Sequence, residues 1–267
     1  MIRNYRELLE FGQSGEKIDS DQITKKILDK NLILYHKIDD DNIDYYSFLL
    51  ETSIVDDKDL FICLENNVVK VLNKMMSKYK ITKKSFILVV GIGNENITAD
   101  SLGEKVCKKI IPTKHLYDNK IIKSGYGILA SFVPSVAGVS GLDSSNIIKA
   151  IVKSQKPDLV IVVDTIAARD YNKLNRCVQI TDDGIVAGGG VGNDKEKLDK
   201  EHLSVPVIAV GVPLVAYISR IISSVTNSNI NLPDKLASWV VSTKEIDFEV
   251  LAFGSVLANC INRSVHK

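Results

Sequence analysis

Two aspartates stand where reactive carboxylates would gather in an α/β protein. Asp100 lies in the loop after an apolar run that ends in glycines, and Asp164 closes the apolar run over residues 158–164. In an open parallel sheet, reactive groups collect beyond the carboxyl ends of the strands. Two neighbouring carboxyls cannot both ionise easily, so one pKa rises and an ionised base stands beside a protonated acid. Such a pair could activate water and protonate a leaving amine.

Each aspartate also has a purely structural interpretation. Asp100 precedes a predicted helix, and carboxylates at helix N-termini accept backbone N–H groups. Asp164 fits a strand-end residue that bonds to the following loop, because an unpaired charge near buried surface is costly. The residues alone leave both interpretations open.

Two glycine-containing segments are candidates for holding a substrate or an oxyanion. The first provides Gly91, Gly93 and Asn94, and it is not a dinucleotide fingerprint because Asn96 stands where a third glycine is required. The second lies within residues 188–193, whose backbone N–H groups could face a carbonyl oxygen or an extended peptide. Its candidate residues are Gly189, Gly190, Gly192 and Asn193. A surface connection is the alternative interpretation of the second segment.

Other kinds of reactive centre have little support. The four cysteines are far apart with no C-x-x-C, which argues against a zinc knuckle and a disulfide framework. The serines near residues 140–145 follow no G-x-S-x-G elbow. His115 and His202 lie within the predicted α/β region and are interpreted first as surface or helix-terminal residues. No metal and no cofactor are predicted.

Composition narrows the class of protein. Hydrophobic residues make up 45% and charged residues 25% of the 267 residues, which is typical of a globular chain. The formal net charge of +1 calls for neither a nucleic-acid nor a membrane partner. The N-terminus lacks the apolar stretch of a secretory signal, and no apolar run approaches the roughly 20 residues that span a bilayer. We therefore expect a cytoplasmic protein.

Short apolar runs alternate with helical patterns. Strands are predicted over residues 86–93, 127–133, 158–164, 177–181 and 205–212. Helices are predicted over residues 21–31, 59–79, 101–111, 143–155, 213–224 and 244–261. Ser101 and Glu104 fit a capping box, and Pro213 fits the first turn of a helix.

This alternation predicts an α/β fold with three α/β/α layers around a mainly parallel sheet, of the phosphorylase/hydrolase-like kind. N-terminal and C-terminal helical segments are added to it. We expect a single domain over residues 1–267. Its parts are a helical region at 1–80, a core at 85–215 and a helical segment at 230–267.

Several sequence blocks resemble the germination (spore) protease family. Their order and spacing are specific, and they cover roughly residues 85–215. The blocks are residues 91–103 (GIGNENITADSLG), 134–141 (PSVAGVSG), 156–169 (KPDLVIVVDTIAAR), 179–185 (QITDDGI), 188–193 (GGGVGN) and 206–213 (PVIAVGVP).

The resemblance implies an endopeptidase that degrades small acid-soluble spore proteins during germination, inside the spore or forespore, without metal or nucleotide. It implies a fold shared with hydrogenase-maturation proteases, a homo-oligomer (a tetramer) and a precursor whose N-terminal segment is removed. The family's two essential aspartates fall on Asp100 and Asp164 of this sequence.

Two departures from the family pattern keep alternatives open. No Arg-Thr-Asp-Leu-like block precedes residue 60, and residues 214–217 are Leu-Val-Ala-Tyr where the family has a Thr-Val-Val-Asp-like stretch. One alternative is a metal-dependent endopeptidase of the hydrogenase-maturation type, with His115 or His202 as a third ligand. The other is a non-catalytic relative that binds peptides.

Overall fold

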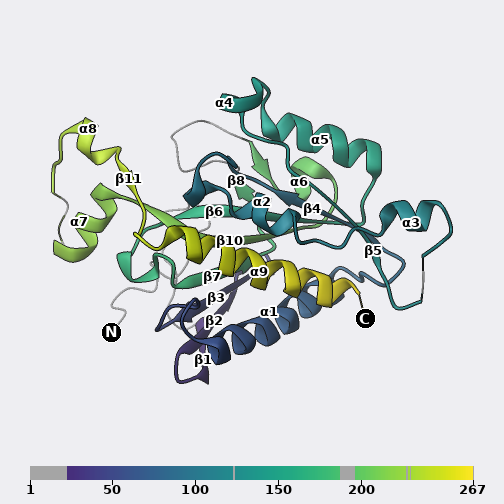
Figure 1. Cartoon of the computed structure of the whole chain (residues 1–267), viewed down its shortest axis with the longest axis horizontal. Helices are drawn as coiled ribbons and strands as arrows, with labels where there is room; N and C mark the ends of the chain where they lie inside the picture. Colours follow the sequence, from purple (N-terminus) through teal and green to yellow (C-terminus); the bar gives the residue numbers. More distant parts are fainter. Residues whose placement is uncertain (1–22, 123, 187–195, 227, 229, 267) are drawn as a thin grey trace.

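The computed structural model of the chain describes residues 23–122, 124–186, 196–226, 228 and 230–266. Within these residues, one mixed sheet of nine strands runs through the protein (Figure 1). Its order is β1 (Ile23–Asp29), β2 (Leu32–Ile38), β3 (Asp44–Leu50), β7 (Cys177–Thr181), β10 (Val207–Tyr217), β6 (Leu159–Ala168), β4 (Phe86–Gly91) and β5 (Ile128–Phe132), with β11 (Val240–Val241) also paired to β10.

β10 is the junction between two halves of the sheet. It pairs in parallel with β6 and antiparallel with β7. The half made of β10, β6, β4 and β5 is parallel, and the half made of β1, β2, β3 and β7 is antiparallel. The α/β class is therefore confirmed, while the sheet as a whole is mixed. The finer phosphorylase/hydrolase-like assignment stays a prediction.

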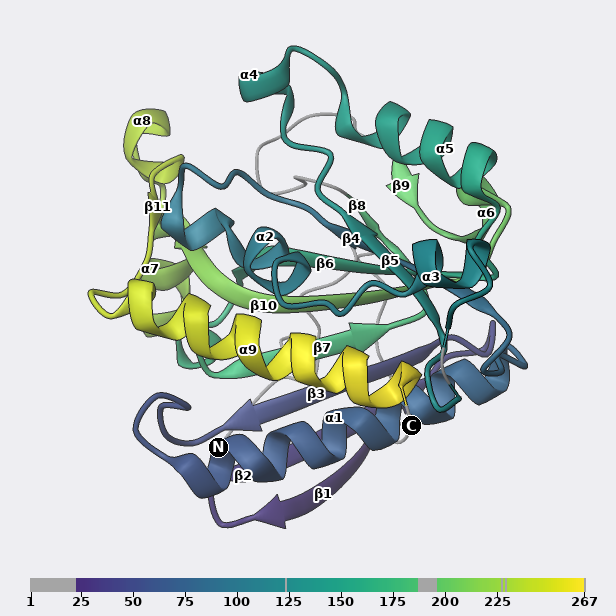
Figure 2. The same ribbon diagram turned by 45° about the vertical axis from the view of Figure 1, so that its right-hand side comes forward.

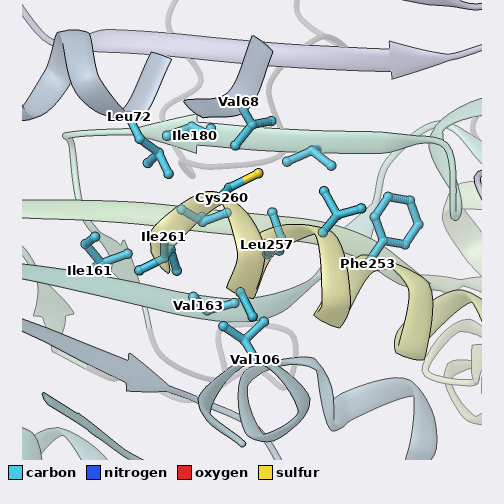
Figure 3. Packing of buried hydrophobic residues seen from close by; sticks show 14 of the residues in the cluster. Val68, Leu72, Val106, Ile161, Val163, Ile180, Phe253, Leu257, Cys260 and Ile261 are labelled. Carbon is cyan, nitrogen blue, oxygen red and sulfur yellow. The ribbon is translucent and has the colours of Figure 1, made fainter. Parts of the chain in front are cut away.

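Three helices pack on one face of the sheet. They are α1 (Lys58–Lys78), α2 (Leu102–Cys107) and α9 (Ile246–Val265). Figure 2 shows α1 and α9 side by side, and these two helices are in contact. Phe253, Leu257 and Ile261 of α9 lie between α1 and the strands (Figure 3). Each of the three is at most 1% exposed, so this layer is a packed core.

The opposite face is covered by α5 (Ser144–Gln155) and α6 (Lys200–Leu203). Ile148 and Val152 of α5 share a second buried cluster with Val160 and Val162 of β6. Since Ile161 and Val163 belong to the first cluster, alternate residues of β6 face opposite sides of the sheet.

Shorter elements lie around these layers. They are α3 (Lys114–Asp118), α4 (Ala137–Ser140), α7 (Ile218–Thr226), α8 (Asp234–Ala237), the 3₁₀ helices η3 (Thr98–Asp100) and η4 (Tyr171–Lys173), and the separate two-stranded sheet of β8 (Ile185–Val186) and β9 (Lys197–Leu198). In the described part of the chain, no helix is both long and apolar enough to cross a membrane.

Most predicted elements are present. The helices expected over residues 59–79, 143–155 and 244–261 correspond to α1, α5 and α9. Asp57 accepts the Leu60 N–H at the start of α1, and Asp143 accepts the Asn146 N–H at the start of α5. The predicted strands correspond to β4, β5, β6, β7 and β10.

The helical region predicted over residues 1–80 is wrong over residues 23–50, which form the strands β1, β2 and β3, and correct only for α1 among its described residues. The helix predicted over residues 21–31 is therefore wrong from Ile23 onward. Residues from Ile23 onward form β1, which pairs with β2, and β3 pairs in turn with β7. A helix pattern this short is easily overridden by long-range strand pairing, and here β1 adds to β2 at the edge of the sheet with most of its side chains exposed. These pairings also join the N-terminal region to the predicted core through one sheet.

The helix predicted over residues 101–111 is shorter than expected and lacks the capping box. α2 ends at Cys107, and the Ser101 hydroxyl donates to the Thr98 carbonyl at 2.8 Å instead of capping α2. Glu104 pairs with Lys105 and Lys108, so it is not free to cap the helix.

Pro213 does not begin a helix. β10 continues through it to Tyr217, and α7 starts at Ile218. The pairing of β10 with β6 shifts register between Pro213 and Val215, and such an irregularity accommodates a residue that has no N–H to donate. The Pro213 carbonyl accepts the Asn175 N–H at 2.8 Å.

Candidate active site

The loop after β4 lies against the strand that carries Asp164. β4 ends at Gly91, and the Ile92 N–H donates to the Val163 carbonyl of β6 at 2.8 Å. Asp100 is the last residue of η3, and η3 contacts both β6 and β10. Both predicted aspartates therefore belong to segments in contact on the parallel half of the sheet, where a crevice is expected.

Asp164 lies inside its strand. We expected β6 to stop at Asp164, but it continues to Ala168 because β10 accompanies it as far as Ala216. Asp164 is 4% exposed. Because neighbouring Val163 belongs to the cluster under α1 and α9, Asp164 faces the side of α5 and α6. A carboxylate held inside a buried strand costs far more than one in a strand-end loop.

Asp100 is held by the turn that precedes it. Its Oδ2 accepts the Asn94 N–H at 2.9 Å. Gly93 has a φ of +124°, and a Cβ there would lie 1.9 Å from the Asp100 carbonyl oxygen. Only glycine fits this conformation and this approach, so the turn fixes where Asp100 lies.

The other predicted residues of this loop have packing contacts. A Cβ at Gly91 would lie 2.2 Å from the Gly103 carbonyl oxygen, so β4 and α2 meet through two glycines. The Asn94 side chain accepts the Asn96 N–H at 3.0 Å. These contacts account for the residue types without a ligand. A role for Gly91, Gly93 and Asn94 in substrate binding stays a prediction.

The second glycine segment, with Gly189, Gly190, Gly192 and Asn193, lies outside the described residues. β8 and β9, which flank that segment in sequence, pair with each other.

Cys107 is the thiol beside this loop, and it is poorly suited to act as a nucleophile. Burial raises the pKa of Cys107 to about 12, so the side chain is a neutral thiol near pH 7. Its Sγ lies 3.6 Å from the Phe132 carbonyl oxygen. Because the thiolate is the reactive form of cysteine, Cys107 is a poor candidate for a nucleophile.

The described residues contain no group of three or more histidine, cysteine, aspartate or glutamate side chains that could hold a metal ion. His202 lies in α6, where its Nδ1 is 2.7 Å from Asp199 Oδ1. His115 lies in α3, which contacts β5. Neither histidine forms part of a metal-ligand cluster with other described residues.

A cluster of buried and half-buried polar side chains, which the sequence did not predict, ties α1 to β3 and β7. We name it the Lys78 cluster, and its members are His36, Asp44, Tyr46, Lys78, Tyr79 and Asp182. Lys78 Nζ lies 2.9 Å from Asp44 Oδ2 and 2.6 Å from Asp182 Oδ2. It also donates to the Asn42 carbonyl. Asp182 lies in one of the family-like blocks, residues 179–185, but nothing in that block indicates its partners.

The charge of the Lys78 cluster is balanced by short contacts. Burial opposes the ionisation of Asp44, but hydrogen bonds from His36 and Lys78 outweigh it and hold the pKa of Asp44 below its ordinary value. Burial likewise opposes the charge on Lys78, and its contacts with Asp182 and Asp44 raise its pKa. Asp182 follows β7 directly, so the cluster fixes the end of that strand.

The comparisons with known proteins agree on one family. The model of the germination protease family matches residues 13–231. A germination protease of Caldanaerobacter subterraneus subsp. tengcongensis is 34% identical over 233 residues, which cover 74% of this chain and 72% of the relative. A germination protease of Oceanobacillus iheyensis is 45% identical over 148 residues, which cover 55% of this chain.

The matched segments differ in extent among these relatives. They span 40% of the Oceanobacillus iheyensis protein and 39% of the germination protease of Bacillus subtilis, which is 41% identical over 142 residues. The chain therefore matches less than half the length of these two curated relatives.

Proposed function

We propose that this chain, which belongs to the germination protease family, is an endopeptidase that uses Asp100 and Asp164 as an acid/base pair. The observation that carries the proposal is the contact of η3, which ends in Asp100, with β6, which buries Asp164. The family match over residues 13–231 supports the class of reaction.

The proposed chemistry needs one ionised and one protonated carboxyl. The carboxylate takes a proton from water, and the water oxygen attacks the carbonyl carbon of the peptide bond. The protonated carboxyl gives its proton to the leaving nitrogen as the C–N bond breaks. The proton taken from water then restores the acid, so the pair returns to its starting state with one shared proton.

The proposed substrates are small acid-soluble spore proteins or other extended peptides, cleaved in the spore interior during germination. This assignment rests on the names of the relatives and on the resemblance of the sequence blocks. Assembly as a homo-oligomer, maturation from a precursor and a cytoplasmic location are parts of the same proposal. The three-layer fold that hydrogenase-maturation proteases share is also part of it. No metal or other cofactor is proposed.

The test is cleavage of an unfolded acid-soluble spore protein by the wild type and by Asp100→Asn and Asp164→Asn. We expect the wild type to cut in the presence of a chelator and each variant to lose cleavage by a factor of 10² or more, in line with the usual contribution of acid–base catalysis. Asp118→Asn is the matched control, because Asp118 is exposed and, among its described contacts, pairs only with half-buried Lys114 in α3.

Each contrary outcome has a definite meaning. Full cleavage by either active-site variant would remove that aspartate from the mechanism. Loss of cleavage with a chelator would favour the metal-dependent alternative. Binding of the substrate by the wild type without cut products would favour a non-catalytic peptide-binding protein.

A further inference from the structure

A row of four residues crosses the sheet at Asp164. Asp164 of β6 pairs with Gly211 of β10, Gly211 pairs with Gln179 of β7, and Gln179 pairs with Ser47 of β3. Directly paired residues on adjacent strands project their side chains to the same face of a sheet. The row thus places Gln179 on the same face as Asp164, with a glycine between them.

The buried clusters support this assignment of faces. Val178 and Ile180 belong to the cluster under α1 and α9, so Gln179 between them faces away from those helices. Val163 belongs to that cluster too, which turns Asp164 the same way. Gln179 is 0% exposed and Asp164 is 4% exposed. A carboxamide and a carboxylate are therefore buried on one face, two strands apart.

The spacing suits an interaction across the glycine. Neighbouring strands lie about 4.8 Å apart, so the backbones of Asp164 and Gln179 are roughly 9.6 Å apart. Side chains stand roughly perpendicular to a sheet, so the Gln179 and Asp164 side chains meet only if both lean toward Gly211. Any larger residue at position 211 would place a side chain between them. Gly211 has no side chain, so no side chain of this row lies between the two groups.

We propose that Gln179 is a positioning residue for Asp164. Its carboxamide reaches over Gly211 and directs an N–H group toward the Asp164 carboxylate, directly or through one bridging water. A buried amide requires hydrogen-bond partners, and a donor aimed at a carboxylate favours the ionised form. Gln179 thereby orients Asp164 and favours its ionised state. This inference rests on the proposed peptidase function, and it adds a residue to which no role has been assigned.

Gln179→Leu removes the donor and keeps a similar volume. We expect kcat for peptide cleavage to fall by about 10-fold or more while KM stays close to the wild-type value, because the lost interaction serves the reacting group. We also expect the acid limb of the pH–rate profile to move up by roughly one unit, since a stabiliser of the ionised carboxylate is gone. Gln179→Glu should move this limb further, because it adds a like charge.

Two further variants separate positioning from general damage. Gly211→Ala inserts a methyl group between the two side chains and should move the acid limb in the same direction. Ser47→Ala is the matched control. Ser47 occupies the same row one strand beyond Gln179, and its Oγ lies 3.2 Å from Cys177 Sγ. It should behave as the wild type. Thermal unfolding of all variants shows which ones are folded.

A second readout keeps the inference testable without turnover. In protein with ¹³C-labelled aspartate carboxyls, the signal that Asp164→Asn removes belongs to Asp164. Its titration midpoint should rise by about one unit in folded Gln179→Leu relative to wild type. If neither the Asp164 midpoint nor the acid limb changes in Gln179→Leu, while the wild type cleaves, the inference about Gln179 is overturned and the proposed function stands. A wild type that does not cleave would overturn the proposed function, and the midpoint would still decide the role of Gln179.

Discussion

Replacing Lys78 by methionine should destabilise the fold measurably. Lys78 Nζ lies between Asp44 and Asp182, whose side chains are only 6% and 1% exposed. Methionine keeps much of the aliphatic volume and removes the cation, so two buried carboxylates would share one site without it. Breaking a buried ion pair by removing one partner usually costs about 3–5 kcal/mol.

The expected cost here is smaller than that range. The Lys78 side chain is 24% exposed, so water can partly replace it. Tyr79 continues to donate to Asp182 at 2.7 Å, and Tyr46 continues to donate to Asp44 at 3.1 Å. These remaining donors reduce the loss to about 2 kcal/mol of unfolding free energy. Urea unfolding near pH 7, followed by circular dichroism, measures it directly.

Acidity should change that cost in a defined direction. The pKa of Asp44 is lowered from an ordinary 3.8, so its stabilisation is present above that pH and is lost as the pH falls below it. The pKa of Lys78 is raised from an ordinary 10.5, so its contribution is lost only in strong alkali. The gap between the wild type and Lys78→Met should therefore shrink below about pH 4.

Lys74→Met is the matched control, one turn earlier on α1. Lys74 is exposed, and its Nζ lies 5.5 Å from the Tyr46 ring. Its loss should cost less than about 1 kcal/mol. A cost for Lys78→Met no larger than that of Lys74→Met would refute the reasoning about the buried carboxylates.

Three further predictions concern the site loop and the core. Gly93→Ala should abolish peptide cleavage, because a Cβ would lie 1.9 Å from the Asp100 carbonyl oxygen. A kcat equal to that of the wild type would contradict the claim that this turn fixes the position of Asp100. Cys107 should resist alkylation in the folded protein at pH 7.5, since burial raises its pKa to about 12, and rapid labelling seen by mass spectrometry would disprove this environment. Phe253→Ala should lower the free energy of unfolding in urea by about 3–5 kcal/mol, because Phe253 is 0% exposed. A loss under 1 kcal/mol would show that neighbouring core residues move to fill the cavity.

Local sequence patterns predicted helices and strands correctly where the spacing of the apolar residues matches the residues that the fold buries. The continuous apolar residues of β4 and β6 indicated strands covered on both faces. The apolar stripe that predicted a helix over residues 59–79 contains six of the seven buried residues of α1, all except Met76. Local patterns failed where long-range pairing decides the structure. Residues 21–31 carry a weak helical pattern, but Ile23–Asp29 pairs as β1 with β2 in a sheet that the sequence does not display.

At the candidate site, too, local patterns predicted some residues, while relations that depend on long-range strand pairing were not predicted. Asp100 and Asp164 were candidates because each follows an apolar run, and the family resemblance singled them out. The segments that carry them are in contact. The relation of Gln179 to Asp164 was not recognisable, because it depends on the register of three strands from distant parts of the sequence. The partners of Lys78 were hidden for the same reason, since Asp44 and Asp182 lie 34 and 104 residues away.

The central claim is that Asp100 and Asp164 are close enough to share a proton. The most direct test is the titration of the Asp164 carboxyl carbon in the wild type and in Asp100→Asn. A neighbouring carboxylate disfavours ionisation, so replacing Asp100 by a neutral amide should lower the Asp164 midpoint by about one unit or more. An Asp164 midpoint that stays the same in folded Asp100→Asn would contradict the claim.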